Sequence, residues 1–151
     1  MQPIKFVPMR FDPTVMRFDP TVDYPLGSRR PDLVETPSGL ALDDVTLEAA
    51  RAGTLIASDV RATPATLRRQ AEVARAAGRT QLADNLDRAA ELTHVPDDEL
   101  LEIYTALRPG RSTAGELEEW ARRLDEWDAP LTAAFVREAV AAYLKRGLVG
   151  G

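Results

Sequence analysis

The sequence predicts an all-α protein in which five to six helices follow an extended, proline-rich N-terminal arm. Seven of the eleven prolines lie in the first 37 residues. From residue 41 onward, apolar residues recur three or four positions apart between helix start and stop signals. No stretch alternates convincingly at the period of two that a half-buried strand requires. These observations divide the chain into an arm over 1–40 and a helical domain over 41–149.

The arm contains a short tandem repeat, because residues 9–22 read MRFDPTV twice. Repeat folds stack at least three units of about 20 residues or more. A heptad coiled coil is also excluded, since Pro13 and Pro20 would each break a helix. The repeat therefore does not define the fold, and a local duplication explains it better than selection for function.

The rest of the arm is expected to have little structure of its own, since residues before prolines favour extended geometry. It nevertheless carries aromatic and aliphatic side chains, among them Tyr24 and Leu33. Such a segment usually lies along another surface. We expect Tyr24–Leu33 to contact a partner, and the alternative is an arm folded back on its own helices.

Two helices are predicted in the first half of the domain. The first spans about 43–53, with Asp43 or Asp44 as its N-cap and Gly53 just past its end. The second follows Thr63 as N-cap, with Pro64 at the first helical position and Gly78 as C′ residue. Its expected core stripe is Leu67, Ala71 and Ala74.

Four further helices are predicted after Gly78. The first, in 79–95, buries Leu82, Leu86, Ala89 and Thr93, and the next, in 96–110, buries Leu100, Ile103, Tyr104 and Leu107. In 112–130, Thr113 and Glu116 form a capping box, and the apolar stripe is Leu117, Trp120, Leu124 and Trp127. The last helix spans roughly Leu131 to Arg146, buries Phe135, Ala139, Ala142 and Tyr143, and ends at Gly147.

Composition excludes several classes of function. The net charge of −5 argues against nucleic-acid binding, which needs clustered Lys and Arg. Without cysteine the chain has no disulfide, thiolate metal site or Cys nucleophile, which fits a reducing cytosol. No apolar run approaches the length of about 18 residues that a membrane span needs. We expect a soluble intracellular protein.

Few residues suggest catalysis. The only histidine, His94, precedes Pro96 at a helix end, where a solvated or capping role is favoured over catalysis. Asp97, Asp98 and Glu99 occupy a first helical turn, where acids interact favourably with the helix dipole. Neither a dinucleotide fingerprint nor a phosphate-binding loop occurs, and TPSG at 36–39 is typical of a tight turn. We therefore predict no catalytic, cofactor-binding or metal-binding residue in this chain.

The remaining candidates point to protein contacts. Arg108 and Arg111 lie in a loop between helices, where guanidinium groups pair with carboxylates inside the chain or across an interface. The alternative is that they neutralise the C-terminal end of the preceding helix. Trp120 and Trp127 are seven residues apart and share one helix face, a spacing more typical of core than of a binding patch.

Six stretches resemble, in order, the small subunit of adenosylcobalamin-dependent diol and glycerol dehydratases. They are DYPL (23–26), TPSG (36–39), DDVTLEAARAG (43–53), TLRRQAEVARAAGR (66–79), NLDRAAELTHVPDDELLEIYTALRPGRST (85–113) and AAFVREAVAAYLKRGLV (133–149). The fifth stretch is the most specific, because so long a run is improbable by chance. The resemblance covers nearly the whole chain after the repeat.

The resemblance implies a subunit of a lyase rather than a self-sufficient enzyme. Members of this family form a complex of large, medium and small subunits, usually doubled. The large subunit is a (β/α)₈ barrel that holds the diol and a metal ion, and adenosylcobalamin lies between the large and medium subunits. Radical chemistry then removes water from the diol and leaves an aldehyde. The small subunit is a mostly helical piece on the outside of the large one, and it donates no catalytic or cofactor group.

From the residues and the resemblance together, we expect subunit contacts at Tyr24, Pro25, Leu26, Arg108 and Arg111. Some family members carry an N-terminal amphipathic helix that directs them into a bacterial microcompartment. Prolines in 1–22 do not allow such a helix here, so a cytoplasmic complex is expected, encapsulated only if a partner carries the signal. The preference for propanediol or glycerol belongs to another chain.

Two other interpretations remain open at the level of sequence. One is a stand-alone helical adaptor of the same ancestry, which binds an unrelated partner through the arm. The other is an enzyme in its own right that uses His94, Arg108 or the acids, and this interpretation requires a concave pocket that holds His94 beside carboxylates.

Overall fold

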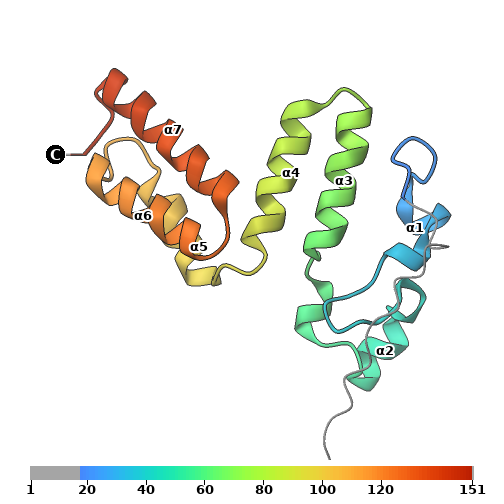
Figure 1. The fold of residues 1–151 in the computed structure, drawn as a ribbon. Coiled ribbons are helices and arrows are strands. Elements are labelled where there is room, and N and C mark those ends of the chain that lie inside the picture. Colours follow the sequence, from blue (N-terminus) through green and yellow to red (C-terminus); the bar gives the residue numbers. More distant parts are fainter. Residues whose placement is uncertain (1–17, 151) are drawn as a thin grey trace, which may run out of the picture.

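The computed structural model describes residues 18–150. These residues form seven α-helices and three short 3₁₀ helices, with a single isolated antiparallel bridge between Glu35 and Ala41 (Figure 1). The α-helices are α1 (Leu26–Arg29), α2 (Leu47–Ala52), α3 (Pro64–Ala76), α4 (Thr80–Leu92), α5 (Asp97–Ala106), α6 (Ala114–Glu126) and α7 (Pro130–Arg146). The 3₁₀ helices are Pro31–Leu33, Leu42–Asp44 and Ala57–Val60. The predicted all-α class is confirmed, and the additional helix is the four-residue α1.

The arm differs from the prediction where it is described. Residues 1–17, with the first copy of the repeat, lie outside the described residues. Residues 18–40 form turns and short helices rather than one extended segment. The Asp19 carboxylate closes a turn by accepting hydrogen bonds from the Thr21 N–H at 2.9 Å and the Thr21 hydroxyl at 2.6 Å. Arg69 of α3 donates to the Leu33 carbonyl at 2.5 Å, so this part of the arm is folded back on the helical domain.

Helix starts follow local capping chemistry, with one correction. The predicted caps at Thr63 and Thr113 are confirmed, since their hydroxyls accept hydrogen bonds from the N–H groups of Thr66 and Glu116, both at 3.2 Å. The Asp43 or Asp44 cap is wrong. Both acids lie in a 3₁₀ helix, and α2 starts after Thr46, whose hydroxyl accepts from the Ala49 N–H at 3.1 Å. Because this 3₁₀ helix ends at Asp44, α2 begins only at Leu47.

Two buried clusters hold the helices together. In the α3–α4 hairpin, Ala71, Ala74 and Ala83 are buried against one another. Small side chains let the two helices approach closely along their length (Figure 1). The larger cluster joins α5, α6 and α7, and its largest fully buried side chains are Leu117, Leu124 and Val136.

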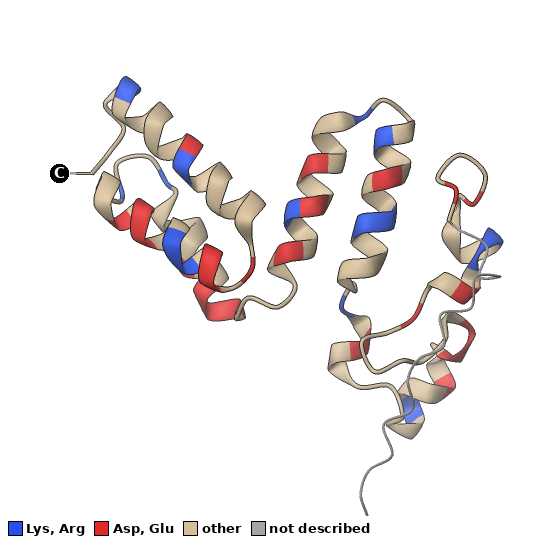
Figure 2. Ribbon diagram, in the orientation of Figure 1, with Lys and Arg blue, Asp and Glu red and all other residues tan. Residues whose placement is uncertain are grey.

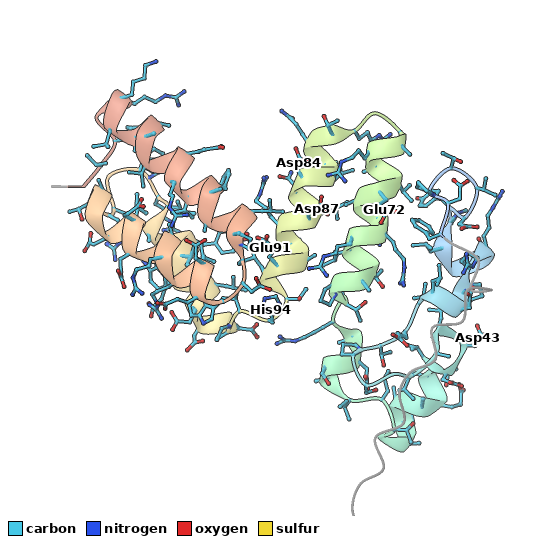
Figure 3. All side chains as sticks on the ribbon, in the orientation of Figure 1. Asp43, Glu72, Asp84, Asp87, Glu91 and His94 are labelled. Carbon is cyan, nitrogen blue, oxygen red and sulfur yellow. The ribbon has the colours of Figure 1, made fainter. Side chains whose placement is uncertain are left out.

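A buried carboxylate connects these two groups of helices. Glu91, near the end of α4, accepts hydrogen bonds from the backbone N–H groups of Leu131 at 3.0 Å and Thr132 at 2.9 Å, and from the Thr132 hydroxyl at 3.0 Å. These N–H groups belong to the first turn of α7, where no intrahelical acceptor exists. The residue at the N-cap position of α7, Ala129, makes no side-chain cap. Glu91 therefore caps a helix that begins about 40 residues later, and it points toward the start of that helix in Figure 3.

A second buried carboxylate organises the N-terminal turns. Asp59 accepts hydrogen bonds from the N–H groups of Ser38 at 3.3 Å and Ile56 at 2.9 Å. It thereby ties the third 3₁₀ helix to the predicted TPSG turn, which is confirmed by the Gly39 N–H to Thr36 carbonyl hydrogen bond at 2.9 Å. Hydrogen bonding by Ser38 and by the Ile56 amide holds the pKa of Asp59 below its usual value, although burial opposes the shift.

We predict that Glu91→Ala lowers the free energy of unfolding by about 2–3 kcal/mol, because it leaves buried donors of α7 unpaired. Thr132→Val removes one of the three hydrogen bonds and should cost about 1 kcal/mol. Glu72→Ala, on the exposed side of α3, serves as the matched control and should change stability by less than about 0.5 kcal/mol. Urea denaturation followed by circular dichroism measures all three. Equal stabilities of the Glu91 and Glu72 variants would contradict the capping role.

The second prediction concerns pH. Because the folded-state pKa of Asp59 lies below its usual 3.8, the charged carboxylate stabilises the fold above that pH, and this contribution is lost as the pH falls through the folded-state value. Asp59→Asn should therefore be less stable than the wild type at neutral pH, and the gap should narrow below pH 3.8. Urea midpoints at both pH values test this, with Asp43→Asn as an exposed control. A difference in stability between Asp59→Asn and the wild type that does not change with pH would contradict this prediction.

Candidate subunit interface

The polar residues considered for catalysis make structural contacts. His94 is exposed, and its Nε2 lies 2.9 Å from the carbonyl oxygen of Trp127 at the end of α6. Asp97 pairs with Arg61 at 2.5 Å, and this hydrogen bonding raises the pKa of the guanidinium. Glu99 pairs with Arg123 of α6. Within residues 18–150, no group of three His, Cys, Asp or Glu side chains is arranged to hold a metal ion, and no helix is long and apolar enough to cross a membrane.

The two tryptophans enclose an arginine. The Arg123 guanidinium lies 4.4 Å from the ring centroid of Trp120 and 5.1 Å from that of Trp127. Both rings are partly buried and pack against the α5–α7 cluster. The predicted core role of this pair is therefore confirmed, and the arginine between the rings also reaches back to Glu99 on α5.

An apolar groove lies where α4, α5 and α7 meet. Its volume is about 170 Å³, and its apolar lining includes Ala89, Leu92, Leu100, Ile103, Tyr104 and Phe135. The polar side chains in the lining come from Asn85, Arg88 and Thr132. Arg88 stacks over Phe135, with its guanidinium carbon 4.9 Å from the ring centroid. We refer to this feature as the α4–α5–α7 groove.

Two aromatic side chains that line the groove are exposed. Tyr104 is 65% exposed and Phe135 44% exposed, whereas Leu101, which is 68% exposed, lines a separate cavity beside Trp120. Apolar residues scattered singly over a surface are normal, whereas a contiguous set marks an interaction site. The groove and these side chains are therefore a candidate interface with another protein.

The structure separates the five residues predicted to contact other subunits. Tyr24 is exposed and lines a shallow cavity with Ala74 and Leu86 of the hairpin. Pro25 beside it is exposed, whereas Leu26 is buried within the chain. Arg108 and Arg111 lie on the opposite side of the molecule, in the α5–α6 loop (Figure 1). The role of these five residues in subunit contacts stays a prediction.

The charges around the α5–α7 helices are unevenly placed. Acidic residues gather at the start of α5, and basic residues occupy the loop after α5 and the end of α7 (Figure 2). The loop and the chain end are joined by two backbone hydrogen bonds of 2.7 Å, from Gly110 N–H to the Leu148 carbonyl and from Gly150 N–H to the Ser112 carbonyl. Among the described residues, Arg108 and Arg111 have no ion-pair partner.

Sequence reasoning missed the groove because it assigned the wrong environment to Tyr104. This residue is three positions from Leu107 and one from Ile103, so the spacing predicted a buried stripe. The prediction is wrong for Tyr104, and Phe135 and Leu82 are likewise exposed rather than buried. The available signal was the width of the apolar surface on α5, because Leu100, Leu101, Ile103 and Tyr104 cover more than one face of this helix. One helix neighbour cannot cover them all.

Comparison with known proteins gives a consistent result. The family model described as "Dehydratase small subunit" matches residues 20–149. The chain is 52% identical over 130 residues to the propanediol dehydratase small subunit of Citrobacter freundii, covering 85% of this chain and 76% of that protein. It is 51% identical over 130 residues to the propanediol dehydratase small subunit of Salmonella typhimurium, covering 85% of this chain and 75% of that protein. The resemblance stated from the sequence is confirmed.

We predict that Arg123→Leu lowers the free energy of unfolding by about 1–2 kcal/mol, since it removes two cation–π contacts and leaves Glu99 unpaired. Arg122→Leu is the matched control, because among the described residues the neighbouring Arg122 pairs with exposed Glu119 and Glu126, and such pairs contribute little. Tryptophan fluorescence during urea unfolding measures the unfolding midpoint of both variants. Indistinguishable midpoints for the two variants would contradict the role of the tryptophan–arginine stack.

Proposed function

Because the chain belongs to the dehydratase small-subunit family, we propose that it is a non-catalytic structural subunit of an adenosylcobalamin-dependent diol dehydratase. The complex would convert a 1,2-diol to an aldehyde with loss of water, as a hydro-lyase. The observation that carries the proposal is the similarity to two propanediol dehydratase small subunits over 85% of the chain. The partners would be a large and a medium subunit, in a doubled heterotrimer.

The proposal assigns the chemistry to the other subunits. Adenosylcobalamin, when bound there, would supply radical initiation of the dehydration, and a metal ion would hold the diol. The contacts of this chain support such a division. Its buried carboxylates are engaged in holding helices and turns, Glu91 at the start of α7 and Asp59 at the Ser38 turn. The single histidine is hydrogen-bonded to a backbone carbonyl.

The contribution of this subunit would be binding energy. A chain that binds only the folded partner shifts the folding equilibrium of that partner by mass action. Stable interfaces bury about 1,200–2,000 Å² or more, and the exposed apolar side chains of this chain provide surface for such contact. Radical reactions need a site that stays closed to water and side reactions. We infer that the small subunit keeps the catalytic subunits correctly assembled and rigid.

Co-expression with the large and medium subunits tests the proposal. We expect one complex that contains all three chains and forms an aldehyde from a diol only when adenosylcobalamin is added. Omitting the small subunit should lower both the thermal midpoint and the activity of what remains. Full activity and an unchanged midpoint without the small subunit would contradict the structural role.

His94→Gln tests the non-catalytic role separately. Within the co-expressed complex, this variant should leave kcat and KM for the diol unchanged, because the His94 ring is hydrogen-bonded to the Trp127 carbonyl of its own chain. The control is wild-type complex prepared in parallel. A loss of kcat in a variant complex of normal composition and stability would show instead that this chain takes part in the chemistry.

A further inference from the structure

We propose that the α4–α5–α7 groove is the site at which an apolar, carboxylate-flanked segment of another dehydratase subunit docks. The inference rests on the proposed function and deepens it by naming the surface and the chemistry of its partner. It is argued from the size of the groove, the side chains exposed around it and the charges at its edge.

The size of the groove favours protein side chains as its occupant. Pockets for small molecules usually measure about 300–1,000 Å³, and this groove has a volume of about 170 Å³. A cavity of that size accommodates an apolar side chain or two from a docked segment. Interfaces are typically centred on such anchors, with aromatic residues prominent among them. Tyr104 and Phe135 supply the aromatic surface on this side.

The charges of the groove specify the partner further. The chain carries a net charge of −5, yet no acidic side chain contributes to the lining. The charged group in the lining is Arg88, which stacks over Phe135. Arg108 follows Tyr104 by four residues and is exposed, and its guanidinium has no ion-pair partner within residues 18–150. An apolar segment with carboxylates at its edge complements both features.

The same charges argue against a second copy of this chain as the occupant. In a two-fold symmetric dimer, the same patch meets itself. The groove of one copy would then bring its Arg88 toward the Arg88 of the other. No acidic side chain lines the groove itself, although Asp84, Asp87 and Glu138 line the neighbouring cavity beside Arg88. Like charges brought together across an interface are unfavourable. A different chain, with acidic residues beside its apolar contact, avoids this repulsion.

Three variants of the full chain test the inference. Tyr104→Ser and Arg108→Glu change exposed groups of the proposed surface, and the double variant Leu47→Ser/Val60→Ser is the matched control. The control residues are 60% and 74% exposed and lie on α2 and the third 3₁₀ helix, remote from the groove in sequence. Circular dichroism and thermal unfolding of each isolated chain establish that all variants fold like the wild type.

The measured quantity is the affinity of each small-subunit variant for the co-expressed large and medium subunits. We expect Tyr104→Ser and Arg108→Glu to weaken binding by about tenfold or more, which corresponds to loss of an interface anchor. The Arg108→Glu effect should shrink at high salt, since charge pairs at an interface rim are screened. The control should bind like the wild type.

The outcomes separate this inference from the proposed function. If the wild type joins the complex and both groove variants bind as tightly as the control, the groove is not the docking site, and the proposed function stands. If the wild type joins no complex, both fail. If the wild type instead forms dimers that Tyr104→Ser abolishes, the occupant is a second copy, and the inference is overturned.

Discussion

The hydrogen bonds that Glu91 accepts from the first turn of α7 join the two groups of helices. The α3–α4 hairpin and the α5–α7 helices have separate buried clusters. The first consists of alanines, and the second combines alanines with leucine, valine and isoleucine side chains. Glu91 spans the junction by supplying the acceptors that the first turn of α7 lacks. Buried backbone donors are costly to leave unpaired, so α4 and α7 keep this arrangement, and the groove between them keeps its shape.

The features that could be predicted from sequence are those decided within a few residues. A hydroxyl at Thr63 or Thr113 reaches an amide three residues on, and the pattern needed for this is visible in the chain. The Glu91 cap joins residues about 40 positions apart, and no local signal distinguishes that acid from the exposed ones on the same helix. The prediction failed at Asp43 for a related reason. Asp43 and Asp44 lie in the first turn of a 3₁₀ helix, and in the sequence such acidic residues look the same as those at the start of an α-helix.

The candidate site was harder to predict than the fold, because burial depends on which neighbours are present. Periodicity identified Ile103 as core, correctly, and placed Tyr104 beside it, incorrectly. The family resemblance could be recognised from motifs such as TPSG and the run over 85–113, and the match over residues 20–149 confirms it. Motifs do not reveal which face binds a partner. The groove exists only where α4, α5 and α7 meet in the folded chain.

Hydrogen exchange of this chain, alone and in complex with the proposed large and medium subunits, tests most directly whether the α4–α5–α7 groove is the docking surface. Hydrogen exchange at amides that open by local fluctuations becomes slower when a partner covers and rigidifies the segment that carries them. Docking at the groove predicts increased protection in α5 and in the first turns of α7, with little change across α2 and the third 3₁₀ helix. Protection confined to α2 and the N-terminal turns, with α5 unchanged, would contradict it.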